Sequence, residues 1–149
     1  MRVEIFQEGK VSLLANKLKE RDVKYILKRI CKELNISNID LTLIITDNNY
    51  IQGINSEYRN EDKPTDVITF VYNDPPFPEI GLKDRYIGDI FLSLEMAEQQ
   101  AEEYNVNLED ELKRLLVHGI LHLVGYDHET SKEDERKMRE REEAILDII

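Results

Sequence analysis

Hydrophobic and polar positions recur along the chain with two different periods, and these periods predict a mixture of strands and helices. A period of two, or a run of β-branched and aromatic residues, predicts strands near residues 3–5 and over 40–46, 67–72 and 87–92. Helical periodicity covers residues 11–34, with a break expected near 21–22, and returns after Asn48, Ser93 and Asn107. Two strand–helix–strand passages predict a partly parallel sheet in an α+β or three-layer α/β domain.

Three of the predicted helices carry recognisable start signals. In the short helix, Asn48 is a candidate N-cap, and the positions expected to be buried are Ile51, Ile54 and Tyr58. The helix predicted after residue 107 has Asn107 as its expected N-cap and acidic residues in its first turn. Its leucine-rich face should anchor it in the core. A last helix is predicted from Thr130 to the C-terminus, with Glu133 completing a capping box.

Composition indicates one globular domain over residues 1–149. Hydrophobic residues make up 41% and charged residues 34% of the chain, a balance typical of a folded protein. No apolar run approaches membrane-spanning length, and the first residues lack the apolar core of a signal peptide. The single cysteine, Cys31, excludes an internal disulfide framework. We therefore expect a cytoplasmic protein that does not associate with membranes.

Charge is spread unevenly along the chain. The net charge of −11 argues against a protein that coats nucleic acid by bulk electrostatics. Residues 1–38 nevertheless carry nine Lys or Arg against five Asp or Glu. Lys24, Lys28, Arg29 and Lys32 lie opposite an apolar stripe on the first long helix. This basic side is either an ordinary solvated helix face or a docking surface for RNA phosphates or a ribonucleoprotein.

All three histidines of the chain lie within one eleven-residue stretch that reads H-G-I-L-H-L-V-G-Y-D-H. His118 and His122 are four residues apart, so on a helix both imidazoles can reach one metal ion. Gly125 allows the chain to turn, which can bring His128 beneath them. Three neutral nitrogens with one open position form the ligand set of a catalytic zinc ion, although nickel, copper and iron also accept imidazole. The alternative is a set of histidines that only pack in the core.

The histidine spacing resembles the zinc motif of the metzincin proteases, H-E-x-x-H-x-x-G-x-x-H. The three histidines and Gly125 match it, but Gly119 stands where the protease has the glutamate that acts as general base. Glycine cannot move a proton. A metallopeptidase is therefore the least favoured function, and cleavage of a generic peptide library would be needed to revive it.

Two further segments, together with the histidine stretch, resemble the YbeY family of bacterial metal-dependent endoribonucleases. Residues 55–70 read N-S-E-Y-R-N-E-D-K-P-T-D-V-I-T-F, and G-D-I follows at 88–90. The resemblance runs from Asn55 into the last helix, including Met138, and is weakest over the first 40 residues. The chain departs from the family after P-T-D-V, where Thr69-Phe70-Val71 replaces a frequent Ser-Phe-Pro.

The resemblance implies a small mixed, partly parallel β-sheet flanked by helices, an α+β fold with a metalloprotease-like zinc helix and the metal in a cleft. It also implies cleavage of single-stranded RNA in 3′-end maturation of small-subunit ribosomal RNA and in ribosome quality control. The expected partners are ribosomal RNA and the ribosome or its small subunit; DNA is not expected. His118, His122 and His128 match the ligands of one zinc ion, and Arg59 matches the functionally important arginine.

The chemistry of RNA cleavage gives these residues roles. A metal ion held by three neutral histidines, His118 among them, can lower the pKa of bound water to about 7 or polarise a phosphoryl oxygen. The planar fork of Arg59 can bind two phosphate oxygens from the opposite side. Alternatively, Arg59 forms a salt bridge with Glu57, Glu61 or Asp62. Lys63 either helps to hold the RNA backbone or is only solvated.

Three residues near these motifs have two interpretations each. Asp66 can be explained as a cap of its loop, and Asp127 either orients a ligand histidine or stabilises a turn. Tyr126 is a candidate general base, although packing explains it as well; no general base can be assigned. A second function also fits the sequence: a non-catalytic ribosome-assembly factor in which zinc staples a helix to its following loop.

Overall fold

The computed structural model describes residues 1–36, 38–72, 86–126 and 131–149. These residues form one four-stranded sheet with the strand order β1-β2-β4-β3. The strands are β1 (Arg2–Glu8), β2 (Asp40–Thr46), β3 (Val67–Val71) and β4 (Tyr86–Ser93). The helices are α1 (Glu20–Glu33), α2 (Asn48–Arg59), α3 (Leu94–Tyr104), α4 (Leu108–Leu123), α5 (Lys132–Ile148) and the short 3₁₀ turn η1 (Leu14–Asn16).

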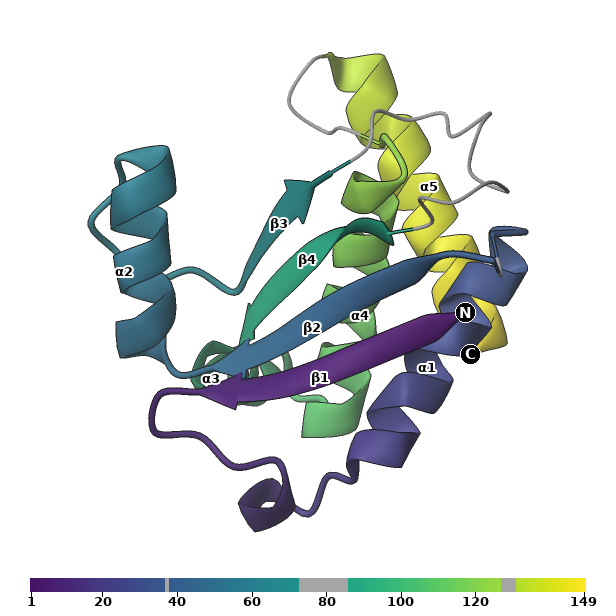
Figure 1. Cartoon of the computed structure of the whole chain (residues 1–149). Coiled ribbons are helices and arrows are strands. Elements are labelled where there is room, and N and C mark those ends of the chain that lie inside the picture. The colour runs from purple at the N-terminus through teal and green to yellow at the C-terminus, as the bar shows by residue number, and fades with distance from the viewer. Residues whose placement is uncertain (37, 73–85, 127–130) are drawn as a thin grey trace.

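The sheet is mixed, as predicted. β1 runs parallel to β2 and β2 parallel to β4, whereas β3 pairs antiparallel with β4. Figure 1 shows α4 crossing behind the sheet, α1 beside it and α5 farther out, while α2 stands apart at the other end. The predicted α+β fold with a partly parallel sheet flanked by helices is therefore confirmed.

The core lies between the sheet and α4. Nine residues of α4 are buried, including Leu115, Leu116 and Ile120. Helix and sheet come so close at Gly119 that a Cβ atom there would lie 3.3 Å from two side-chain carbons of Ile90. The predicted leucine-rich anchor is confirmed, and this helix becomes the most firmly embedded one in the described structure.

The N-terminal half agrees with the predicted pattern apart from one boundary. The apolar stripe of α1 is buried as expected, but the helix break lies at residues 17–19 and not near 21–22. Lys17 adopts left-handed backbone angles and its N–H closes the 3₁₀ turn on Leu14, so the chain turns before α1 begins. On the basic side, Arg29 donates to the carbonyl oxygen of Ile148, which ties α1 to the end of α5.

The predicted cap and buried face of α2 are partly wrong. Asp47, not Asn48, is the N-cap: its carboxylate accepts from the N–H of Tyr50 and also from the N–H of Lys10. The buried positions are Ile51 and Asn55, whereas Ile54 is only half-buried. Asn55 points inward because its Nδ2 donates to the carbonyl oxygen of Lys63 in the following loop.

Two further corrections concern exposure and the last helix. Tyr58 is 61% exposed and not buried, and its ring contacts that of Phe70 in β3 edge to face. The N-cap of α5 is Ser131, whose Oγ accepts from the N–H of Asp134. The predicted capping box therefore starts one residue too early, and Thr130 itself lies outside the described residues. Asn107 caps α4 as predicted, accepting from the N–H of Asp110.

Candidate metal centre and its cleft

Two histidines of α4 converge on one point. The Nε2 atoms of His118 and His122 lie 3.2 Å apart, and the two rings are 4.7 Å apart between centroids in an edge-to-face arrangement. Both side chains line a cleft of about 540 Å³ between α4, β3 and the end of α2. The cleft is lined by Arg59, Thr65, Asp66, Val67, Ile68, Thr69, Val71, His118, His122, Gly125 and Tyr126.

The spacing of the two imidazole nitrogens fits a shared metal ion. Zinc–nitrogen bonds of about 2.0–2.1 Å with a near-tetrahedral angle place two ligand nitrogens about 3.3 Å apart. The observed separation of 3.2 Å matches that value. This separation is compatible with two ligands of one metal ion, and the metal itself stays a prediction.

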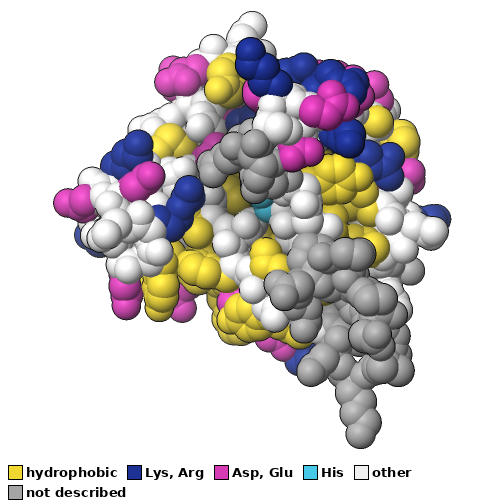
Figure 2. Space-filling view, turned by 90° about the horizontal axis from the view of Figure 1, so that it is seen from above, with side chains coloured by type: hydrophobic (Ala, Val, Ile, Leu, Met, Phe, Trp, Pro, Cys, Tyr) yellow, Lys and Arg dark blue, Asp and Glu magenta, His cyan; other side chains and the backbone are white. Residues whose placement is uncertain are grey.

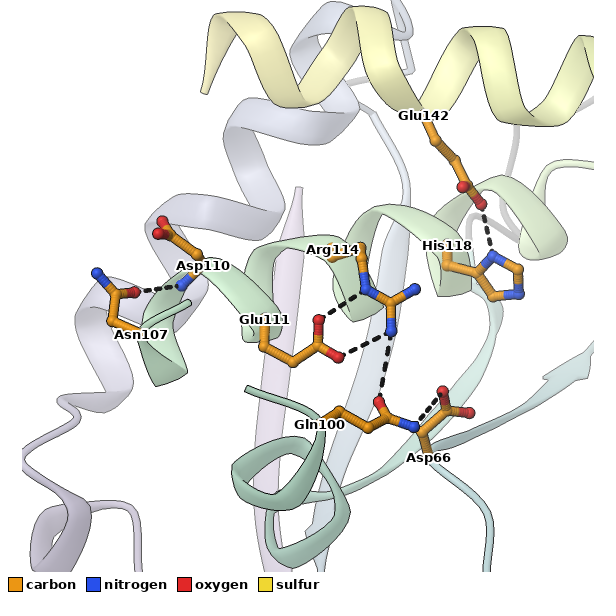
Figure 3. A network of polar contacts seen from close by, with 8 residues as sticks. All are labelled: Asp66, Gln100, Asn107, Asp110, Glu111, Arg114, His118 and Glu142. Atoms are coloured by element: carbon orange, nitrogen blue, oxygen red, sulfur yellow. Dashed lines mark hydrogen bonds and ion pairs between the residues drawn. The ribbon is translucent and has the colours of Figure 1, made fainter. Parts of the chain in front are cut away.

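Glu142 of α5 fixes the orientation of the first histidine. Its Oε1 lies 2.5 Å from Nδ1 of His118, across the space between two helices (Figure 3). A carboxylate only accepts hydrogen bonds, so this contact favours the proton on Nδ1 and leaves the Nε2 lone pair directed at the cleft. Metal-bound histidines commonly have such a carboxylate partner. No periodicity in the sequence pointed to Glu142.

The third predicted ligand, His128, lies outside the described residues, as does Asp127. The described chain ends α4 with a Schellman turn: Gly125 has a φ of 105°, and the N–H of Tyr126 donates to the carbonyl oxygen of Leu121. Within the described ranges, no three His, Cys, Asp or Glu side chains gather into a metal site. Cys31 is fully buried, and burial raises the pKa of its thiol to about 12. The described residues thus contribute two of the three predicted ligands.

Gly119 faces the sheet and not the cleft. The atoms that a Cβ atom would meet belong to Ile90 and Val67 of the sheet. A glutamate at this position would have to displace packed core side chains before it could reach the histidines. The absence of the protease's general base, which the sequence indicated, therefore has a packing reason.

Arg59 is the last residue of α2 and lines the cleft beside β3. Its side chain is exposed and makes no hydrogen bond or ion pair with another described residue. The alternative in which Arg59 is held by a neighbouring carboxylate is therefore wrong for the described chain: Asp62 instead accepts from Gln52, and Glu61 lies 4.0 Å from Lys63. The guanidinium remains available to an anion in the cleft.

Lys63 is not among the residues that line the cleft. Its side chain is 71% exposed and its Nζ lies 4.0 Å from Glu61, a distance at which an exposed ion pair contributes little. The structure therefore brings Arg59 together with the histidines but leaves Lys63 outside the cleft wall. A role of Lys63 in holding RNA stays a prediction.

A polar network lies beside His118, toward the N-terminal end of α4 (Figure 3). Glu111 is buried and accepts two hydrogen bonds from Arg114, at 2.6 and 2.8 Å, which raise the pKa of that guanidinium. Arg114 also contacts Gln100 of α3, and Gln100 contacts Asp66, the residue before β3. Asp66 caps its own loop by accepting from the N–H of Val67 at 2.7 Å, as one interpretation of the sequence proposed. Asp66 also lines the cleft, which the sequence did not indicate.

Comparison with known proteins decides the family. The family model described as Endoribonuclease YbeY matches residues 5–149. The chain belongs to the YbeY family. An Endoribonuclease YbeY of Sulfurihydrogenibium is 44% identical over 91% of this chain and 86% of that protein. The YbeY of Fusobacterium nucleatum is 51% identical over 78% of this chain and 75% of that protein.

A solved structure agrees with this family membership. The solution structure of TM1509 from Thermotoga maritima superposes with a TM-score of 0.64 at 32% identity, covering 97% of this chain and 86% of that one. The YbeY match begins at residue 5, so it includes the first 40 residues, over which the resemblance seen in the sequence is weakest. In the described part of the chain, no helix is both long and apolar enough to cross a membrane.

Proposed function

We propose that this YbeY-family chain is a metal-dependent endoribonuclease that cleaves single-stranded RNA. The observation that carries the proposal is the pairing of two convergent histidine nitrogens with an arginine that has no protein partner in the described structure, all lining one cleft. The two histidine nitrogens suit a metal ion, and the arginine suits a phosphate. Both are what phosphodiester cleavage requires.

In this proposal each residue has a defined task. His118 and His122, with His128 as third ligand, hold one zinc ion, and Glu142 keeps the ring of His118 in the orientation that presents Nε2. The metal, when bound, supplies a Lewis acid and lowers the pKa of its water to about 7. Arg59 binds the non-bridging oxygens of the scissile phosphate and stabilises the charge that develops there. Another divalent transition metal would fit the same nitrogen ligands.

We further propose that the natural substrate is the 3′ end of small-subunit ribosomal RNA, matured in the cytoplasm with the ribosome or its small subunit as partner, and that ribosome quality control uses the same activity. The support is membership of a family named for endoribonuclease activity, together with the expectation from the sequence motifs. The net charge of −11 means that the protein as a whole repels RNA. A partner that presents the RNA to the cleft would offset this repulsion.

The alternative function, an assembly factor stapled by zinc, has less support from the fold. A stapling metal should be needed to hold α4 and its following turn. Yet α4 is already fixed by nine buried residues, and its end is closed by backbone hydrogen bonds at Gly125 and Tyr126. We therefore expect the metal to act in chemistry more than in folding.

The proposal is tested with purified protein and end-labelled RNA of one sequence, offered as a single strand, as a duplex and as the DNA equivalent. We expect cleavage of the single-stranded RNA only, its loss after chelation and its return when zinc is added. His122→Ala, purified in parallel, controls for contaminating nuclease and should be inactive. Cleavage that survives both chelation and this substitution would overturn the proposal.

A further inference from the structure

A second groove shares one lining residue, Tyr126, with the cleft. It has a volume of about 310 Å³ and is lined by Tyr126, Lys137, Glu140, Arg141 and Ala144. The side chain of Tyr126 is half-buried and lines both this groove and the histidine cleft, so the two hollows are neighbours. Its other lining residues all belong to α5, so the groove lies between that helix and Tyr126, just beyond the end of α4.

The groove carries more positive than negative charge. Lys137 is exposed and makes no hydrogen bond or ion pair with another described residue. Arg141 donates to the carbonyl oxygen of Glu33, a neutral acceptor that leaves its charge uncompensated. The one carboxylate in the lining, Glu140, is bonded to Arg136 at 2.8 Å. Two cations thus face a groove whose only acid already has a partner.

This local excess matters because the protein as a whole is acidic. A strand of RNA reaches the histidines only if cations near the cleft offset the repulsion by the rest of the surface. Figure 2, which looks onto this face from above, shows a recessed histidine with Lys and Arg side chains on two sides of it. Arg59 lies on one side of the cleft, and Lys137 and Arg141 line the groove beyond Tyr126.

We propose that this groove binds the RNA backbone next to the scissile phosphate. The strand then passes from Arg59 over the two histidines and across Tyr126, and its next phosphates lie between Lys137 and Arg141. The tyrosine ring at the junction offers a surface on which a base can stack whatever its identity. This inference rests on the proposed function, which it extends from one phosphate to a path for the strand.

The test measures binding and not cleavage, so that the two proposals fail separately. The probe is a fluorescent single-stranded 2′-O-methyl RNA, checked by gel to be intact, titrated with the metal-loaded full chain at several salt concentrations. Lys137→Ala should weaken binding about tenfold, the lower end for a hydrogen bond to a charged group. The slope of log K against log salt should fall by about 0.7 for each lost phosphate contact.

Arg139→Ala is the matched control, because Arg139 is exposed on the same helix and does not line the groove. It should bind RNA as the wild type does. Circular dichroism and metal content show whether each variant is folded and loaded. Three results would overturn the proposal that the groove binds RNA. They are equal binding by wild type and Lys137→Ala, an equal loss of binding in Arg139→Ala, and no binding by the wild type. Absence of cleavage with binding as described would overturn the proposed function alone.

Discussion

The two walls of the cleft are built in opposite ways. α4, which carries the histidines, has nine buried residues and lies so close to the sheet that a Cβ atom at Gly119 would crowd Ile90 at 3.3 Å. α2, which carries Arg59, has two buried residues, and its last two residues are exposed. The two histidines are therefore held by core packing, whereas Arg59 ends a helix that is held by its Asp47 cap, a loop hydrogen bond, two buried residues and the contact of Tyr58 with Phe70.

This difference suits the separate tasks that we propose for the walls. A metal ion requires ligand nitrogens fixed to within a few tenths of an ångström, which buried helices provide. A phosphate on a flexible strand tolerates a long side chain that adapts to it, and Arg59 at the end of an exposed helix can do so. Substitutions on the two walls should therefore have different effects on metal binding, on stability and on cleavage.

The largest effect is expected where α5 supports the histidine wall. Glu142→Ala removes the acceptor of His118 Nδ1, and loss of such a partner typically lowers metal affinity about 10–100-fold. Competition with a chromogenic chelator measures the zinc affinity directly, without any assay of cleavage. Glu143→Ala, an exposed neighbour, is the control. Unchanged affinity in Glu142→Ala would show that the carboxylate does not orient the ligand.

A pair of glycine substitutions compares the packing of the two walls. Gly119→Ala pushes a methyl group against Ile90, and overpacking of this kind costs about 1–3 kcal/mol, which exceeds the gain of about 1 kcal/mol from helix propensity. Gly53→Ala in α2 meets no atom within 4 Å and should stabilise the protein by up to about 1 kcal/mol.

Urea unfolding of both glycine variants gives the sign of each change. The expected order of stability is Gly53→Ala, wild type, Gly119→Ala. A stabilised Gly119→Ala would mean that α4 is packed less tightly against the sheet than the structure indicates.

The smallest effect concerns the cap that holds α2. Hydrogen bonds from the N–H groups of Lys10 and Tyr50 lower the pKa of Asp47. A lowered pKa means that the stabilisation is present above the unfolded value of about 3.9 and is lost as pH falls through the folded value. Asp47→Ala should therefore cost about 1 kcal/mol near neutral pH and progressively less in acid.

Urea unfolding of Asp47→Ala and wild type at pH 7 and pH 3 measures this change. Zinc affinity should be the same in both proteins, because the cap lies on the arginine wall. A loss of stability that does not shrink in acid would contradict the role of the carboxylate as a charged cap.

Periodicity predicted the histidine wall better than the arginine wall. The leucine spacing of α4, its Asn107 cap and the spacing of His118 and His122 are local signals, and all were visible in the sequence. The cap of α2 was misplaced by one residue because Asp47 is selected partly by a hydrogen bond from Lys10, 37 positions earlier. Such a contact leaves no periodic trace.

Residues that act across helices were missed for the same reason. Glu142 reaches His118 from another helix, 24 positions later, and Asp66 contacts Gln100 of α3 across 34 positions. By contrast, Glu111 and Arg114 are three residues apart on one helix, a spacing that could have revealed their pairing. The fold and the pair of histidines therefore follow from local patterns, while the groups that orient the site require the three-dimensional structure.

We claim that the histidine wall holds the metal and the arginine wall holds the phosphate, so matched variants should separate zinc binding from cleavage. Zinc content and cleavage of a single-stranded RNA are measured for wild type, Arg59→Ala, His122→Ala and the remote control Arg21→Ala. We expect Arg59→Ala to keep its zinc and lose cleavage, His122→Ala to lose both, and Arg21→Ala to keep both. Full cleavage by Arg59→Ala, or loss of its zinc, would contradict the claim.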